Sequence, residues 1–192
     1  ELGADIQALE SKKDEDYVPN LTRLARDATD LTWATGFKFE KALPEVAKKF
    51  KDSKFGVIDT NLGGKIPNNV IAVTFKEEEA AFLVGVAAAL TTKTNKVGFI
   101  GGINSELIEK FRVGYTQGVK AVNSKCQVDW AYTDSFSDAT KGRSLASTMY
   151  NSGVDVIFHA AGWGGKGLFE EVKTRAQGKY WAIGVDCDQS KL

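Results

Sequence analysis

Hydrophobic residues recur along this chain in two rhythms. Short apolar runs rich in β-branched residues are typical of buried strands, and apolar positions three or four residues apart are typical of helices. Strands are predicted at residues 5–9, 30–35, 54–59, 70–75, 96–100, 127–132, 155–159 and 180–185. Helices are predicted at residues 17–28, 39–50, 77–91, 105–122, 139–151 and 168–176, with Ser105 as an N-cap. The two rhythms alternate almost without exception.

This alternation predicts an α/β fold in which parallel sheets carry helices on both faces. The number of strands favours two lobes over a single sheet. We expect the boundary near Phe75 and Lys76, which gives an N-terminal lobe of residues 1–75 and a C-terminal lobe of residues 76–192. The longest apolar stretch, residues 80–90, is shorter than a membrane span and is interpreted as a packed helix.

Charge and composition exclude several classes of function. Lys and Arg together number 25 and so do Asp and Glu, so no basic excess favours nucleic acid as a partner. His159 is the only histidine, which excludes a multi-histidine metal site, and it is expected to close a buried strand. Cys126 and Cys187 form no CxxC pair and are expected to be buried free thiols. No cofactor is implied.

The residues that follow the predicted strands are the candidates for ligand contact, because ligands of open parallel sheets bind beyond the carboxyl ends of the strands. These segments are 36–37, 59–60, 101–104, 134–136, 161–164 and 186–188. They are rich in acids, glycines and aromatic residues, and they contain no lysine or arginine. Such a set suits a neutral, flat ligand with hydroxyl groups, since carboxylates accept hydrogen bonds, aromatic rings stack and glycines allow close backbone approach.

Each candidate also has a structural interpretation. Asp59 and Asp186 could be no more than caps of the next turn, without contacting a ligand, and Phe136 could belong to the core. Trp163 could be a lid, a ligand wall or a surface residue. The glycines around it do not match the G-x-G-x-x-G dinucleotide motif. A joint metal or glycosidase role for Asp186 and Asp188 is not expected.

No catalytic residue stands out. His159 is accompanied by no serine or cysteine nucleophile motif, and no metal-ligating cluster is visible in the sequence. We therefore predict no catalytic residue and no metal-binding residue, and we do not expect the chain to be an enzyme.

Four segments resemble the basic-membrane-protein family, the PnrA-like substrate-binding lipoproteins of nucleoside ABC transporters. They are VTFKEEE at 73–79, KTNKVGFIGG at 93–102, DVIFHAAG at 155–162 and IGVDCDQS at 183–190. The resemblance runs over essentially the whole chain. It implies a type I periplasmic-binding-protein fold, with the ligand in the cleft between two Rossmann-like lobes.

The resemblance also implies roles for four residues, and Trp163 departs from the family pattern. Asp59 matches an acid that contacts the base, and Phe136 matches one of two aromatic residues that stack on it. Gly162 matches a backbone contact on the ribose side, and Asp186 matches the acid that binds the ribose hydroxyls. Trp163 stands where a small residue is expected, so the ribose side would be narrower.

By this resemblance, the chain is expected to bind a purine nucleoside (adenosine, guanosine or inosine) for import through an ABC permease. It would be a monomer, outside the cytoplasm and lipid-anchored to the cell membrane. The family has a further strand before this sequence and further segments after it, so the first lobe is expected to be incomplete here. An adhesin or host-protein binder on the same fold is the alternative, and a nucleoside hydrolase is a third.

Overall fold

The computed structural model describes residues 3–27 and 29–192, and it divides into two compact units, Glu1–Phe75 and Lys76–Leu192. Each unit has its own parallel sheet, of three strands in the first and four in the second. The fold is therefore α/β with parallel sheets. The sequence prediction for Ala28, as the end of a helix, lies outside the described residues.

The first unit has the strand order β1-β2-β3. Its elements are η1 (Asp14–Asp16), α1 (Tyr17–Arg26), β1 (Thr32–Thr35), η2 (Phe37–Glu40), α2 (Ala42–Lys49), β2 (Phe55–Ile58), η3 (Leu62–Gly64) and β3 (Val70–Val73). Leu21 of α1, Val46 of α2 and Leu62 of η3 all belong to one buried cluster with Val57 of β2. The strands follow one another across the sheet in chain order. Right-handed crossovers that always move in one direction across a parallel sheet lie on the same face of it.

The opposite face of this first sheet is not covered by any described helix. Trp33 and Ile71 are exposed there, and both lie in register with Gly56, over which the Trp33 ring packs. The prediction of helices on both faces is thus wrong for the described part of the first unit. The unbroken strand order is the reason, because only a reversal of direction places helices on the second face.

The predicted strand at residues 5–9 is also wrong. Residues 3–12 contain no helix or strand, and the Ile6 side chain is 85% exposed. The apolar alternation is present in the sequence, but a strand exists only where its N–H and C=O groups find a partner strand. Among the described residues, β1 pairs with β2 alone.

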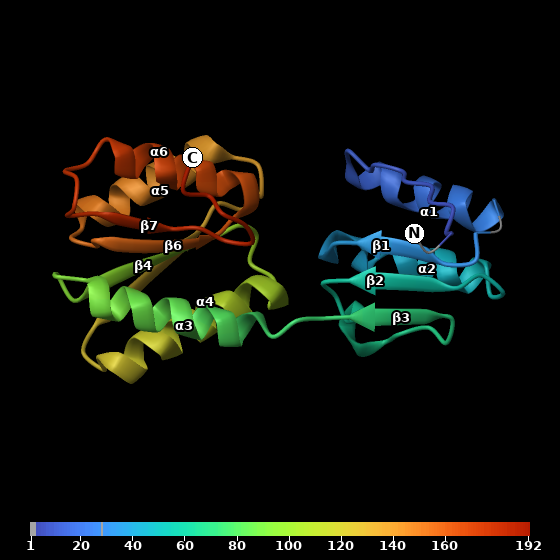
Figure 1. The fold of residues 1–192 in the computed structure, drawn as a ribbon, viewed down its shortest axis with the longest axis horizontal. Coiled ribbons are helices and arrows are strands. Elements are labelled where there is room, and N and C mark those ends of the chain that lie inside the picture. The colour runs from blue at the N-terminus through green and yellow to red at the C-terminus, as the bar shows by residue number, and fades with distance from the viewer. Residues whose placement is uncertain (1–2, 28) are drawn as a thin grey trace. The chain divides into compact units, whose positions relative to one another are not determined.

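The second unit has the strand order β5-β4-β6-β7, which reverses direction (Figure 1). Its elements are α3 (Glu77–Thr91), β4 (Lys96–Gly101), α4 (Glu106–Val122), β5 (Gln127–Tyr132), α5 (Ala139–Asn151), β6 (Val156–Ala160), η4 (Gly162–Gly165), α6 (Lys166–Lys173) and β7 (Trp181–Ile183). The chain crosses from β4 to β5 on one side and then from β5 over to β6 and β7 on the other. This reversal covers both faces of the sheet with helices.

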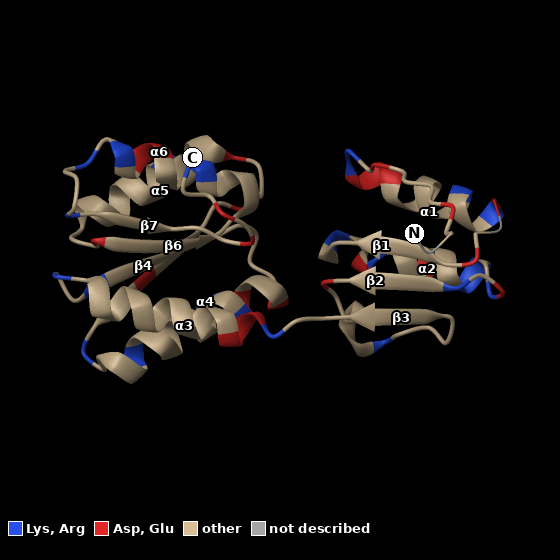
Figure 2. Cartoon of the chain, viewed as in Figure 1, with Lys and Arg blue, Asp and Glu red and all other residues tan. Residues whose placement is uncertain are grey.

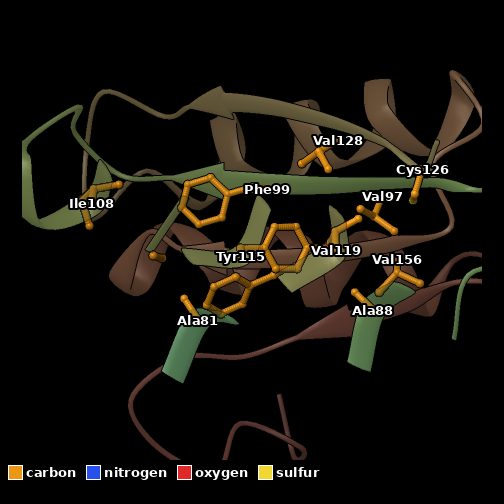
Figure 3. Packing of buried hydrophobic residues seen from close by; sticks show 12 residues of the cluster. Ala81, Ala88, Val97, Phe99, Ile108, Tyr115, Val119, Cys126, Val128 and Val156 are labelled. Carbon is orange, nitrogen blue, oxygen red and sulfur yellow. The ribbon is translucent and has the colours of Figure 1, made fainter. Parts of the chain in front are cut away.

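Alternate residues of the strands serve the two helical layers. Phe99 and Phe158 pack with Tyr115 and Val119 of α4 and with Ala81 of α3 (Figure 3). On the other face, Ile100 and Ile157 pack with Ala146, Met149 and Leu168 of α5 and α6. Strand β6 is buried along its whole length, since it lies between two strands and two helical layers.

Three glycines bring α3 and α4 into backbone contact. A Cβ atom on Gly85 would lie 2.1 Å from the carbonyl oxygen of Tyr115, and one on Gly118 would lie 2.0 Å from that of Phe82. A Cβ atom on Gly114 would likewise lie 2.3 Å from the carbonyl oxygen of Glu78. The apolar stretch at residues 80–90 is therefore a packed helix, as predicted.

The sequence located most of the helix ends to within three residues. Ser105 is the N-cap of α4, as predicted, and its Oγ accepts a hydrogen bond from Ile108 N–H at 3.4 Å. Most charged residues lie on helices and loops, as Figure 2 shows. Cys126 is a buried free thiol as predicted, whereas Cys187 is exposed because it lies in the loop after β7. Every described helix is too short or too polar to cross a lipid bilayer.

Candidate functional site

The point of reversal in the second sheet lies between β4 and β6, and this is where an open parallel sheet forms its ligand crevice. The segments that leave these strands are tied to each other by backbone hydrogen bonds. Gly102 N–H donates to Ala160 at 2.9 Å, and Asp134 N–H, after β5, donates to Gly102 at 3.0 Å. Gly164 N–H, after β6, donates to the carbonyl of Phe136 at 3.2 Å. The three loops therefore form one connected edge.

Phe136 lies half-buried on this edge, with its ring against the backbone of Gly102. A Cβ atom on Gly102 would lie only 2.3 Å from Cε1 of that ring, so a glycine is required for the ring to occupy this place. Gly162 approaches from the other side, where a Cβ atom would lie 3.1 Å from the Phe136 carbonyl oxygen. The structure thus brings together Phe136 and Gly162, which were selected because each follows a predicted strand, and their contact with a ligand stays a prediction.

Three acids that follow strands share a left-handed backbone. Asp59, directly after β2 in the first unit, has φ of 71°, Asp134 has 54° and Asp186 has 64°. Few non-glycine residues adopt this conformation, and aspartate is among those that tolerate it because its side chain hydrogen-bonds locally. Such conformations concentrate at functional sites, and here they follow β2, β5 and β7.

The two remaining candidates, Trp163 and Asp186, are more exposed than a core residue. Trp163 is 60% exposed in η4, with the Lys166 ammonium 5.2 Å from its ring centroid. Asp186 is exposed in the loop after β7. Neither side chain belongs to the hydrophobic core.

The cations near this edge are paired with acids, which the sequence did not predict. Lys141, in the first turn of α5, lies 2.6 Å from a carboxylate oxygen of Asp134. Arg112 of α4 donates from Nε to both carboxylate oxygens of Glu109, at 3.1 and 3.0 Å. The Tyr132 hydroxyl donates to Glu109, and burial, reinforced by that carboxylate, raises the pKa of Tyr132 to about 12. Tyr132 therefore remains a neutral donor at physiological pH.

His159 lies in the buried strand β6 and is fully buried, but the strand ends at Ala160, one residue later than predicted. Its Nε2 lies 3.0 Å from Oε1 of Gln189, and its Nδ1 accepts a hydrogen bond from Ala161 N–H at 3.3 Å. Burial lowers the pKa of the imidazole, although the hydrogen bond to Gln189 and the charge of Asp186 act in the opposite direction. The contact to Gln189, 30 residues away, has no signal in the sequence.

Two other acids have structural roles. Asp155 is buried at the start of β6, where its carboxylate accepts hydrogen bonds from Thr92 Oγ1 and from the N–H groups of Lys93 and Thr94. Asp188 accepts from Ser190 N–H at 3.0 Å, and its hydrogen bonds to Ser190 lower its pKa. Among the described residues no group of three His, Cys, Asp or Glu side chains could hold a metal ion.

The family model of the PnrA-like ABC transporter substrate-binding proteins matches residues 1–192. The chain belongs to this family. It is therefore a member of a group of substrate-binding proteins of ABC transporters, as its four segments predicted.

Relatives support the assignment at moderate identity. The "CD4+ T-cell-stimulating antigen" of Listeria monocytogenes is 44% identical over 194 residues, with 98% of this chain and 54% of that protein covered. The "ABC transporter nucleoside-binding protein BmpA" of Lactococcus lactis is 40% identical over 195 residues, with 99% of this chain and 55% of that protein covered. The chain thus spans about half the length of these relatives.

Solved structures agree on the fold. An ABC transporter solute-binding protein from Aeropyrum pernix superposes with a TM-score of 0.87 at 29% identity, covering 99% of this chain and 55% of that one. A LacI-family regulator from Corynebacterium glutamicum superposes with a TM-score of 0.70 at 12% identity, covering 95% of this chain and 65% of that one. The second likeness shows the fold alone, which is of the periplasmic-binding-protein type.

Proposed function

We propose that this PnrA-like chain is the ligand-binding part of an extracytoplasmic protein that captures a purine nucleoside for an ABC permease. The family supplies the general role, and the printed name of the Lactococcus relative supplies the class of ligand. The proposal includes a monomer that is lipid-anchored to the cell membrane.

The observation that carries this proposal is the set of acids in left-handed conformation after β2, β5 and β7. Carboxylates accept hydrogen bonds from sugar hydroxyls and from ring N–H groups, and a purine nucleoside has both. Asp134 already pairs with Lys141.

Each candidate residue then has a role. We assign Asp59 to hydrogen bonding with the base, Phe136 to stacking against it, and Trp163 to a ligand wall. Asp186 would accept from the ribose hydroxyls, and Gly162 would offer its backbone close to the sugar. The proximity of Gly162 to Phe136 supports this assignment, because base and ribose are joined by one bond.

The cations near the site support a neutral ligand. Lys141 and Arg112 are each held by a carboxylate, and Lys166 lies over Trp163 and 3.7 Å from Glu170. A phosphate group would have to break one of these pairs to gain a partner of opposite charge. The nucleoside is therefore the better ligand than its monophosphate.

The experiment is to denature the purified complete protein and to identify any released small molecule by mass spectrometry. An intact purine nucleoside is expected. A free base with its sugar cleaved would indicate a hydrolase and would contradict the proposal. Release of no small molecule, combined with binding to host proteins and with no nucleoside uptake defect in a deletion strain, would favour the adhesin.

A further inference from the structure

The His159 ring is packed on two sides. The ring meets Phe169 of α6 edge-on, with 5.6 Å between centroids and 86° between planes. A Cβ atom on Gly165 would lie 2.0 Å from Cε1 of the imidazole, so the backbone of η4 lies directly against the ring. This packing holds the ring plane, and the hydrogen-bond partners distinguish the two ring nitrogens.

The hydrogen bonds identify the tautomer. Ala161 N–H can only donate, so Nδ1 of His159 accepts and carries no proton. The proton of the neutral ring is therefore on Nε2, which donates to Oε1 of Gln189 at 3.0 Å. Burial lowers the pKa of this imidazole, which keeps the ring in the neutral form that these two bonds require.

Gln189 carries the connection into the loop after β7. Its Oε1 also accepts from Val185 N–H at 2.9 Å, so one oxygen joins the histidine to the backbone on the amino side of Asp186. A Cβ atom on Gly184 would lie 2.5 Å from this same oxygen, which shows how closely the amide lies on the chain. Asp186 stands inside the closed loop, with φ of 64°.

We propose that His159 and Gln189 are a positioning pair that fixes the backbone around Gly162 and Asp186 together, without touching the ligand. This inference rests on the proposed function, in which those two residues form the ribose side of the site. One ring nitrogen holds the segment that enters η4, and the other holds the loop after β7 through Gln189. The pair therefore sets the spacing between the two ribose contacts.

Two variants of Gln189 test the pair. Gln189→Leu removes the acceptor and leaves His159 Nε2–H and Val185 N–H without it, whereas Gln189→Glu keeps an oxygen for both. Lys191→Ala, at an exposed position two residues further along the chain, is the matched control. A lost acceptor in a buried network corresponds to about 10-fold or more in an equilibrium constant. We expect that loss of nucleoside affinity in Gln189→Leu, about 3-fold or less in Gln189→Glu, and no loss of free-base affinity in either.

Measurements on the ligand-free protein separate this inference from the proposed function. Nitrogen-15 NMR should report the Nε2–H tautomer of His159 in the wild type. The amides of Ala161 and Val185, which donate into this network, should exchange with solvent about 10-fold faster in Gln189→Leu, but not in Gln189→Glu.

An Nδ1–H tautomer, or unchanged exchange in Gln189→Leu, would overturn the pair. So would equal losses of base and nucleoside affinity in that variant, since a general loss of structure would affect both ligands. If exchange responds as expected but the wild-type protein binds no nucleoside, the pair stands and the proposed function is wrong.

Discussion

The acids at the strand ends combine a carboxylate with an unusual backbone conformation, and a single substitution can change both at once. Asp59, Asp134 and Asp186 offer carboxylates, and they also hold a left-handed backbone that alanine adopts at a cost of about 1–2 kcal/mol. Asparagine tolerates this conformation nearly as well as aspartate and removes the charge. A comparison of the two substitutions therefore separates chemistry from backbone strain.

Asp186 gives the sharpest prediction at this scale. Asp186→Ala should weaken nucleoside binding by about 2–4 kcal/mol, because two hydrogen bonds to a carboxylate are lost. Asp186→Asn should lose less, and a free purine base should lose almost nothing in either variant. Isothermal titration of each variant with a nucleoside and its base is the measurement, and Lys191→Ala, at an exposed position, is the control. Equal losses for base and nucleoside would make Asp186 a structural cap.

Gly102 gives a second prediction. A methyl group there would lie 2.3 Å from the Phe136 ring, so Gly102→Ala should displace the ring and remove its stacking on the base. The expected loss of nucleoside affinity is about 0.5–1.5 kcal/mol beyond any change in buried area. Gly164→Ala is the matched control, because its added Cβ would meet only ordinary contacts, the nearest at 3.5 Å. Similar affinities in the two variants would place Phe136 outside the site.

The sequence predicted those parts of the site that depend on position along a strand. Phe136 and Gly162 were selected because they follow predicted strands, and the structure brings them into contact. It could not predict Gln189 as the partner of His159 or Lys141 as the partner of Asp134, since both contacts depend on how loops fold back. The fit of Gly102 under Phe136 is likewise a property of three-dimensional packing.

At the scale of elements, the contact between α3 and α4 is the most constrained feature of the second unit. Gly118→Ala should lower the free energy of unfolding by about 1–3 kcal/mol, because its Cβ would meet a backbone carbonyl that cannot rotate away. The higher helix propensity of alanine offsets part of this loss. Chemical denaturation is the measurement, with the exposed Gln117→Ala on the same helix as control. A stability equal to that of the control would mean that the helices separate readily.

The sequence predicted elements well wherever local pattern and tertiary pairing agree. The helix at 77–91 and the strand at 127–132 were found with their observed bounds, because each has a clear period and clear ends. The strand at 5–9 was predicted from pattern alone, and no described strand pairs with it. Coverage of only one face in the first sheet follows from strand order, which no local pattern reveals.

At the scale of the whole molecule, His159 links stability to pH. Burial lowers its pKa in the folded state from the ordinary 6.5, so the unfolded chain binds the proton more readily. The free energy of unfolding should therefore have its full value above about pH 6.5, and it should fall as the pH drops below that value. Thermal unfolding between pH 7.5 and 5 is the measurement.

Gln189→Glu is the matched variant for this prediction. A carboxylate beside the ring favours the imidazolium and raises the pKa of His159 towards its ordinary value, so the fall in stability should be smaller. The same pH dependence in both proteins would assign the effect to other groups.

The central claim is that this PnrA-like chain belongs to a protein that binds a neutral purine nucleoside. Isothermal titration of the complete natural protein with adenosine, guanosine, inosine and their 5′-monophosphates tests it most directly. We predict that one nucleoside binds at least about 10-fold more tightly than its monophosphate, because the phosphate would meet acids and cations that are already paired. Equal or tighter binding of the monophosphate, or no binding of any nucleoside, would contradict the claim.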